Sequence, residues 1–196
     1  MDISKFRWLN ESKLTIDGSE FTIYAPPKCD FFNNPALENG EFAKPLGNAP
    51  FLYTEVEGDF VIRVRVTPCF ISTYDASCIM VIHDENVWLK AAYEKSDFGT
   101  TAVVSVVTNE VSDDANGCNL DVESVWLQVA RVENCFTIHY SLDGVRFDMV
   151  RLCRLPVDTT LKVGVEAQSP IGNGGEHRFS DLNIEKRTVK NLRTGV

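Results

Sequence analysis

Apolar and polar residues alternate along most of this chain with a period of two. Because successive side chains of a β-strand point to opposite faces of a sheet, the pattern predicts strands. The segments that show it are KLTIDG (13–18), EFTIYAPP (20–27), FVIRVRVTP (60–68), CIMVIHD (78–84), VWLKAAYE (87–94), TAVVSVVTNE (101–110), VWLQVARV (125–132), CFTIHYSLDG (135–144), RFDMVRLCRL (146–155), LKVGVEAQ (161–168) and FSDLNIEK (179–186). No window long enough for a helix shows helical periodicity.

Turn-forming residues separate these segments. They are Asp17-Gly18, Glu57-Gly58-Asp59, Asp84-Glu85-Asn86, Asn116-Gly117, Glu133-Asn134 and Asp143-Gly144. Such residues tolerate the backbone angles of tight turns, which predicts hairpins and antiparallel pairing. A parallel sheet would need crossover helices, which the pattern lacks. We therefore expect one all-β domain over residues 1–196, a sandwich of two antiparallel sheets.

One segment, PPKCDFFNNPALENGEFAKPLGNAP at residues 26–50, breaks the alternation. It is rich in Pro, Asn and Gly and contains Phe31, Phe32 and Phe42, so it predicts a long loop that carries aromatic side chains. Two interpretations remain open. Long ordered loops in compact domains are often functional, but the phenylalanines would equally serve to plug one end of the sandwich.

Composition and charge narrow the classes of function. A chain of 196 residues with 44% hydrophobic and 24% charged residues suits one globular domain. A net charge of -9 disfavours nucleic acid and anionic membranes, because phosphate groups are bound by clustered Lys and Arg. The N-terminus has no basic start followed by an apolar run, and no stretch approaches the ~20 apolar residues of a membrane span. We expect a cytoplasmic protein.

The cysteines favour a reducing environment and no zinc site. They lie singly along the chain, at Cys29, Cys69, Cys78, Cys118, Cys135 and Cys153. Structural zinc needs closely paired thiolates or histidines, and no CxxC pair occurs. We expect free thiols that serve as small core residues.

The segment 87–94 carries the first candidate binding residues. Alternation places one apolar set in the core and Trp88, Lys90 and Glu94 on the opposite face, with neighbours two apart separated by ~6.8 Å. A ring, an ammonium and a carboxylate in a row suit a sugar, whose flat face stacks on an aromatic ring and whose hydroxyls bind charged groups. An ordinary solvated sheet face is the alternative, although an exposed Trp is harder to explain that way. Other strands offer polar residues for the same face: Gln128, His139, Glu166 and Gln168.

Several motifs together resemble a known family. They are YDASCIMV (74–81), VWLKAAYE (87–94), VVTNEVSDD (106–114), YSLDGVRF (140–147) and VGVEAQSP (163–170). The chain resembles a family of concanavalin A-like proteins, long described as a domain of unknown function, that includes a fungal regulator of enolase. The resemblance implies a lectin/glucanase-like jelly roll without an established activity. It also suggests that Asp75, Arg131, and Ser112 or Asp113 orient a ligand over the row.

A glucanase would need two carboxyl groups across the scissile bond. The Glu-x-Asp-x-Glu array of jelly-roll glucanases is absent around Glu94, where Ala92 and Lys90 stand two and four residues before it. We expect Lys90 to lower the pKa of Glu94, which suits a binder better than a general acid. Asp113, Asp114 and Asn116 could form a calcium site, but an oxygen-rich turn explains them more simply.

The sequence therefore predicts a non-catalytic binding module for a carbohydrate or sugar-like metabolite on the concave sheet face, with no cofactor and no metal. The alternatives are a regulatory protein-interaction role and, third, a glycoside-active enzyme. A homodimer that covers the row also stays open. The candidate ligand-binding residues are Asp75, Trp88, Lys90, Glu94, Ser112, Asp113, Arg131 and His139.

Overall fold

The fold is built almost wholly from β-strands. The computed structural model describes residues 3–196, apart from the side chains of Ser4, Glu38 and Phe42. Within this part of the chain the one helical element is a 3-10 turn at Ile3–Lys5, and no helix is long and apolar enough to cross a membrane. Strands therefore carry the whole architecture.

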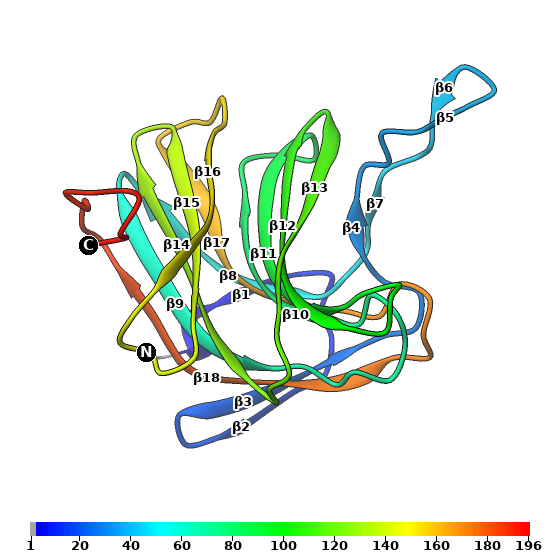
Figure 1. Ribbon diagram of the computed structural model, residues 1–196, viewed down its shortest axis with the longest axis horizontal. Helices are drawn as coiled ribbons and strands as arrows, with labels where there is room; N and C mark the ends of the chain where they lie inside the picture. Colours follow the sequence, from blue (N-terminus) through cyan, green and yellow to red (C-terminus); the bar gives the residue numbers. More distant parts are fainter. Residues whose placement is uncertain (1–2) are drawn as a thin grey trace.

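Two antiparallel sheets of seven strands pack face to face (Figure 1). Sheet A contains, in spatial order, β1 (Arg7–Leu9), β8 (Phe51–Glu57), β17 (Thr160–Gln168), β10 (Ala76–Ile82), β11 (Val87–Lys95), β12 (Thr101–Asn109) and β13 (Val111–Asn119). Sheet B contains β16 (Asp148–Arg154), β15 (Cys135–Ser141), β14 (Val125–Val132), β9 (Phe60–Thr67), β18 (Gly175–Glu185), β3 (Glu20–Ala25) and β2 (Leu14–Asp17). The predicted all-β sandwich is confirmed.

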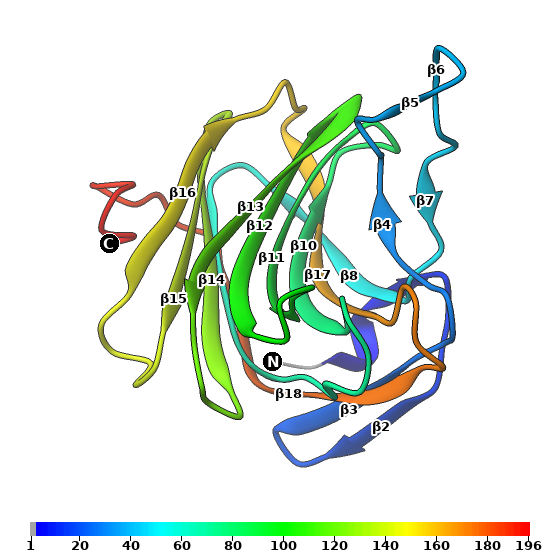
Figure 2. The same cartoon turned by 45° about the vertical axis from the view of Figure 1, so that its right-hand side comes forward.

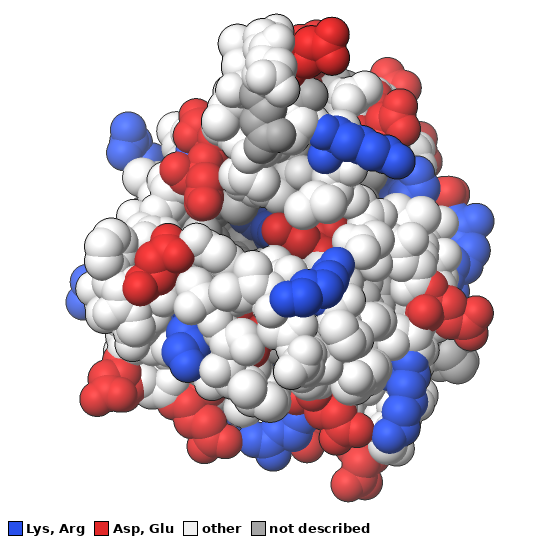
Figure 3. All heavy atoms as spheres, turned by 90° about the vertical axis from the view of Figure 1, so that its right-hand side faces the viewer, with Lys and Arg blue, Asp and Glu red and all other residues white. Residues whose placement is uncertain are grey.

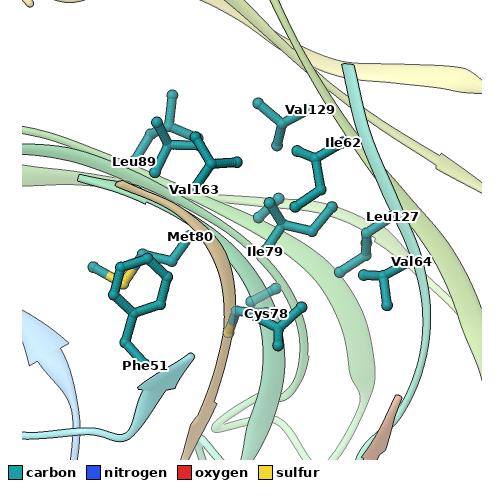
Figure 4. Close-up of a cluster of buried hydrophobic side chains, with 14 of the residues drawn as sticks. Phe51, Ile62, Val64, Cys78, Ile79, Met80, Leu89, Leu127, Val129 and Val163 are labelled. Atoms are coloured by element: carbon teal, nitrogen blue, oxygen red, sulfur yellow. The ribbon is translucent and has the colours of Figure 1, made fainter. Parts of the chain in front are cut away.

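The core lies between the two sheets, and strand alternation fills it. Figure 4 shows Ile79 and Val163 of sheet A pointing toward Ile62 and Leu127 of sheet B. All four side chains are fully buried. Burying an aliphatic side chain contributes roughly 1.5–3 kcal/mol, so this layer holds the sheets together. Met80, one residue after Ile79, points to the opposite side of sheet A.

That opposite side is the concave face of sheet A, which is turned away from sheet B (Figure 2). An arm formed by residues 26–50 stands over it (Figure 2). The arm contains two pairs of two-residue strands, β4 (Phe31–Phe32) with β7 (Leu46–Gly47) and β5 (Leu37–Glu38) with β6 (Glu41–Phe42). The segment expected to be a loop thus covers a sheet face and not the end of the sandwich.

Specific contacts fasten the base of the arm to sheet A. The Asn33 backbone N–H donates to Ser112 Oγ at 2.9 Å. The Phe31 ring meets the Trp88 ring edge-on, with centroids 6.2 Å apart and an interplanar angle of 71°. Of the three phenylalanines noted in this segment, the Phe42 side chain lies outside the described part. Hydrogen bonding and aromatic packing together hold the arm against the concave face.

The sequence pattern misses three strands of sheet A, namely β1, β8 and β13. The β8 segment follows the arm and has an apolar start, FLY, that hides its alternation. β13 is a polar edge strand, so it has no apolar face to recognise. As a result, Asn116-Gly117 lies within a strand and not at a turn, and Glu57-Gly58-Asp59 links sheet A to sheet B without forming a hairpin.

Gly164 of β17 lies where the backbone of β8 approaches closely. A Cβ at this position would lie 2.0 Å from the Leu52 carbonyl oxygen and 2.7 Å from the Tyr53 Cα. We expect Gly164→Ala to destabilise the fold by about 3 kcal/mol or more, because backbone atoms cannot move aside as side chains can. Chemical denaturation measures the loss. Gly47→Ala is the control, since its nearest contact is an ordinary 3.6 Å, and equal losses in both variants would contradict the argument.

Candidate functional site

Strand β11 places Trp88, Lys90 and Glu94 on the concave face, opposite the core-facing Leu89 and Tyr93. The predicted division of this strand into two faces is therefore correct. The exposure is not as expected, because the three side chains are only 2%, 2% and 8% exposed. The arm covers Trp88, Lys90 and Glu94, so these side chains form a buried floor and not an open groove.

Trp88 is a packing residue under the arm. Besides its contact with Phe31, it lines a cavity of about 450 Å³ that we call the apolar cavity. The lining residues are Leu9, Phe31, Pro45, Leu46, Gly47, Ile82, Asp84, Glu85, Trp88 and Lys162. The interpretation of Trp88 as an exposed stacking platform is wrong, because arm residues already occupy the ring's surroundings.

Lys90 is the centre of a buried polar network. Its ammonium donates to Asp30 Oδ1 at 3.0 Å, to the Phe31 carbonyl at 3.0 Å and to Gln168 Oε1 at 2.6 Å. These acceptors use all three ammonium protons. Burial lowers the pKa of Lys90, but the charges of Asp30 and Glu166 outweigh that effect and raise it overall. Lys90 is therefore a fixed positive charge.

Glu94 lies beside this network with an unusual acidity. Its Oε2 accepts a hydrogen bond from Gln168 Nε2 at 3.3 Å. Burial raises the pKa of Glu94 to about 8, against the opposing charge of Lys90, and the charges of Asp114, Asp30 and Glu166 raise it further. The expected direction of the Lys90 effect is right, but the net expectation of a lowered pKa is wrong because desolvation is the larger contribution.

Glu166 is a second carboxyl group of the floor. It is fully buried on β17, one strand over from β10, where it pairs in register with Cys78. Neither of its carboxyl oxygens has a hydrogen-bond partner among the described residues. Burial raises the pKa of Glu166 to about 7, although the charge of Lys90 and the neighbouring Cys78 thiol work in the opposite direction. The floor thus holds two carboxyl groups that ionise near neutrality.

A cavity of about 250 Å³, which we call the charged cavity, opens above Lys90 and Glu94. Its lining residues are Asp30, Phe32, Tyr74, Lys90, Glu94, Asp97, Val106, Asp114 and Gln168. Figure 3 shows a hollow below the arm with acidic and basic atoms inside it. Strand β4 lies between the two cavities. Its two side chains line different ones, Phe31 the apolar cavity and Phe32 the charged cavity.

Tyr74 at the mouth of the charged cavity has a strained backbone. Its φ is 68°, a left-handed value that is unusual for a bulky residue and often marks functional sites. The Tyr74 carbonyl accepts from Gln168 Nε2 at 2.9 Å, and its hydroxyl donates to Asp97 Oδ1. That hydrogen bond, with a smaller contribution from burial, raises the pKa of Tyr74 to about 12.

Asp114 forms the opposite rim. It keeps solvent contact, yet partial desolvation raises its pKa, with Lys90 opposing and Asp30 adding to the shift. Strand alternation turns its neighbour Asp113 to the other face, where it pairs with Arg151 at 2.9 Å. The oxygen-rich turn imagined for calcium is therefore a strand that separates these carboxylates. In the described part of the chain no group of three or more His, Cys, Asp or Glu is arranged to hold a metal ion.

Two other predicted residues shape the surroundings of the cavity. Asp75 is buried and folds the loop before β10, because its Oδ2 accepts from the backbone of Ile71 and Ser72 at 3.0 and 2.6 Å. Ser112 is buried beneath the arm, where its hydroxyl contacts Asn33. Neither Asp75, Ser112 nor Asp113 lines the charged cavity. Asp113, which pairs with Arg151, is not expected to contact a ligand in this cavity, whereas the orienting roles of Asp75 and Ser112 stay predictions.

Arg131 and His139 lie on sheet B. Gln128 pairs with His139 in that sheet, so the expectation that Gln128 and His139 share a face with Lys90 is wrong. The Arg131 guanidinium donates to backbone carbonyls, including Thr159 at 2.7 Å and Asp158 at 2.7 Å, and so ties loops together. His139 Nε2 lies 3.1 Å from the Arg193 carbonyl, under the C-terminal segment. Alternation predicts which side of its own strand a side chain lies on, but not which sheet the strand joins.

The cavity also contains residues that the candidate set omits. Gln168 lines the cavity and Glu166 lies beneath it, both on the face that alternation predicts. Asp30, Tyr74 and Asp97 lie in loops, which carry no periodic signal, and the sequence singles out Asp114 only as a possible calcium ligand. The DFF triplet that starts at Asp30 was the available clue, since it combines a carboxylate with two rings inside a long loop.

Sequence comparison places the chain in a family. Residues 8–187 match the family model described as "Protein of unknown function (DUF1349)". The chain belongs to the DUF1349 family. A curated relative, "Regulation of enolase protein 1" of Saccharomyces cerevisiae, is 30% identical over 185 residues, which cover 93% of this chain and 90% of the relative. The resemblance inferred from the motifs is confirmed.

Solved structures agree on the fold of this DUF1349 protein. A functionally unknown protein from Saccharomyces cerevisiae has a TM-score of 0.86 at 28% identity, covering 94% of this chain and 98% of that one. A legume lectin-like domain from Entamoeba histolytica gives 0.57 at 9% identity, with 94% and 91% covered. The GH43 protein BlXynB from Bacillus licheniformis gives 0.62 at 12% identity, but the match covers 84% of this chain and only 32% of that enzyme. The latter two show a shared lectin/glucanase-like sandwich.

Trp88→Ala should remove arm packing. We expect a loss of ~3–5 kcal/mol in the free energy of unfolding, as for other buried Trp truncations. Urea denaturation followed by circular dichroism measures it. Phe98→Ala is the control, because Phe98 is 85% exposed and its loss should change stability by less than ~0.5 kcal/mol. A Trp88→Ala protein as stable as the control would contradict the packing role.

The raised pKa values of Glu94 and Glu166 predict how stability depends on pH. The folded protein holds these protons more tightly than the unfolded chain, so their stabilising effect is complete below pH ~4 and is lost as pH rises through about 7 to 8. Glu94→Gln should reduce the fall in stability between pH 5 and pH 8.5 by about 1–3 kcal/mol. Melting curves across this range measure it. Glu123→Gln, at an exposed carboxylate, should keep the wild-type slope; a wild-type slope in Glu94→Gln would disprove the assignment.

Proposed function

We propose that this DUF1349 protein binds one small polyhydroxylated, sugar-like molecule in the charged cavity. The observation that carries the proposal is a preformed hollow whose floor is fixed by buried hydrogen bonds of Lys90 and Gln168. Its volume of about 250 Å³ lies just below the ~300–1,000 Å³ typical of drug-sized ligands, and it suits a single sugar ring.

The chemistry of the lining supports a hydroxyl-rich ligand. Asp97 and Asp114 on the rim offer carboxylate oxygens, which accept hydrogen bonds from sugar hydroxyls. The Phe32 ring and the Val106 side chain add an apolar wall for the C–H face of a ring. The lectin-like fold is compatible with binding but carries no argument for a particular sugar.

Glycoside hydrolysis is a second candidate because of one observation. A carboxyl group with a pKa near 8, such as Glu94, keeps its proton at neutral pH and has the property required of a general acid. Asp114 or Asp30 would be the second carboxylate. Release of reducing sugar from disaccharides, absent in Glu94→Gln, would distinguish this function from simple binding.

A regulatory role is compatible with the binding proposal. The name of the yeast relative refers to regulation of enolase, and in that case the bound molecule would act as a signal for a protein partner. The arm would be the element that reports occupancy, because Asp30 and Phe32 line the cavity while Phe31 packs on Trp88.

A cavity-blocking variant tests the proposal. Asp114→Trp places a large ring at the rim and should weaken binding of a monosaccharide found by NMR or calorimetric screening by about tenfold or more. Asp113→Trp is the matched control, since that side chain points away from the cavity and is paired with Arg151. Retained binding in Asp114→Trp, or no binding of any neutral, amino or acidic monosaccharide to the wild type, would overturn the proposal.

A further inference from the structure

The hydrogen-bond donors of the charged cavity are already in use. Lys90 donates all three ammonium protons to protein acceptors. Gln168 Nε2 donates to the Tyr74 carbonyl and to Glu94, and the Tyr74 hydroxyl donates to Asp97. Among the lining side chains, only Glu94 can still donate, and only when it carries its proton. A ligand that must accept hydrogen bonds finds few donors here.

Acceptors, in contrast, remain available. An ionised carboxylate has about four acceptor positions. Both hydrogen bonds of the Asp30 carboxylate fall on Oδ1, from Lys90 Nζ at 3.0 Å and from the Phe31 backbone N–H at 2.7 Å, which leaves Oδ2. Asp97 and Asp114 stand at the solvent-exposed rim. The cavity is therefore complementary to a ligand that donates hydrogen bonds.

The balance of charge points in the same direction. Besides the protonated Glu94, the lining contains the carboxyl groups of Asp30, Asp97 and Asp114 against the single ammonium of Lys90. Beneath it, Glu166 is a fully buried carboxyl group beside the Cys78 thiol, and neither of its oxygens has a hydrogen bond of ordinary geometry in the described structure. A second positive charge in the cavity would relieve this excess of carboxyl groups electrostatically.

We infer that the ligand is an amino sugar, whose protonated amine binds between Glu94 and Asp114 and whose hydroxyls donate to the other carboxylate oxygens. This inference rests on the proposed function and specifies the class of sugar. Sugar phosphates and uronic acids are disfavoured, because the ammonium of Lys90 has no free proton for them and the rim carboxylates repel them. A metal ion is disfavoured as the cation, since within residues 3–196 no suitable group of ligands is arranged for one.

Amine binding should expel a proton. Glu94 faces Lys90 on its own strand, Gln168 and Glu166 on β17, Asp114 on β13 and Asp30 on the arm. In the free protein this surrounding favours protonated Glu94 at neutral pH. An ammonium group next to the carboxyl reverses that preference, and the released proton goes to the buffer.

The test is isothermal titration calorimetry at pH 7 with four probes: glucosamine, glucose, glucuronic acid and putrescine. We expect glucosamine to bind about tenfold or more tightly than glucose, and glucuronic acid and putrescine to bind most weakly. The heat of glucosamine binding should differ between phosphate and Tris buffers, in the direction of proton release. Asp114→Asn should reduce the preference for glucosamine over glucose to about threefold or less, while Asp113→Asn retains it.

Each other outcome overturns the inference. Equal affinity for glucose and glucosamine would show that the amine is not recognised, while the proposed sugar site would still be supported. Tighter binding of putrescine than of glucosamine would show that the site recognises an amine without a sugar ring. Tighter binding of glucuronic acid would show that the site prefers a negatively charged ligand. Failure of all four probes would also reject the amino sugar, and the wider monosaccharide screen would then decide the proposed function separately. Melting curves of Asp114→Asn confirm that the variant is folded.

Discussion

The buried ammonium of Lys90 is the interaction on which the concave face depends. A charge with 2% exposure is tolerable only when it is paired and fully hydrogen-bonded, and the partners here come from two distant parts of the chain. Asp30 and the Phe31 carbonyl belong to the arm, whereas Gln168 belongs to β17. Without Lys90, the arm would lose its polar anchor and the floor would hold uncompensated carboxyl groups.

The same arrangement explains why the carboxyl groups behave differently from surface acids. Glu94 and Glu166 lose much of their hydration under the arm. The single positive charge of Lys90 already pairs with Asp30, and it cannot also balance the negative charges of two further carboxylates. Their protons are therefore retained near neutral pH. A site with this composition resists a second buried anion and favours a partner that brings hydrogen-bond donors.

Much of the fold was accessible from sequence because the alternation of β10, β11, β14 and β17 follows one physical rule. The rule also placed Lys90, Glu94, Glu166 and Gln168 on a common face. It could not reveal that the arm would bury that face, because burial by a non-periodic segment depends on tertiary packing. For the same reason the pattern predicts an exposed Trp88. Alternation also does not specify which sheet a strand joins, so it places Gln128 and His139 on the wrong sheet.

The composition of β13 has a consequence for how sheet A ends. An edge strand presents unpaired backbone N–H and C=O groups to solvent and invites another chain to extend the sheet. β13 carries Asp113, Asp114 and Asn116 on the edge, and the opposite edge strand, β1, has only three residues. Charge at one border and brevity at the other both oppose uncontrolled strand addition, so Asp114 serves the edge of the sheet as well as the rim of the charged cavity.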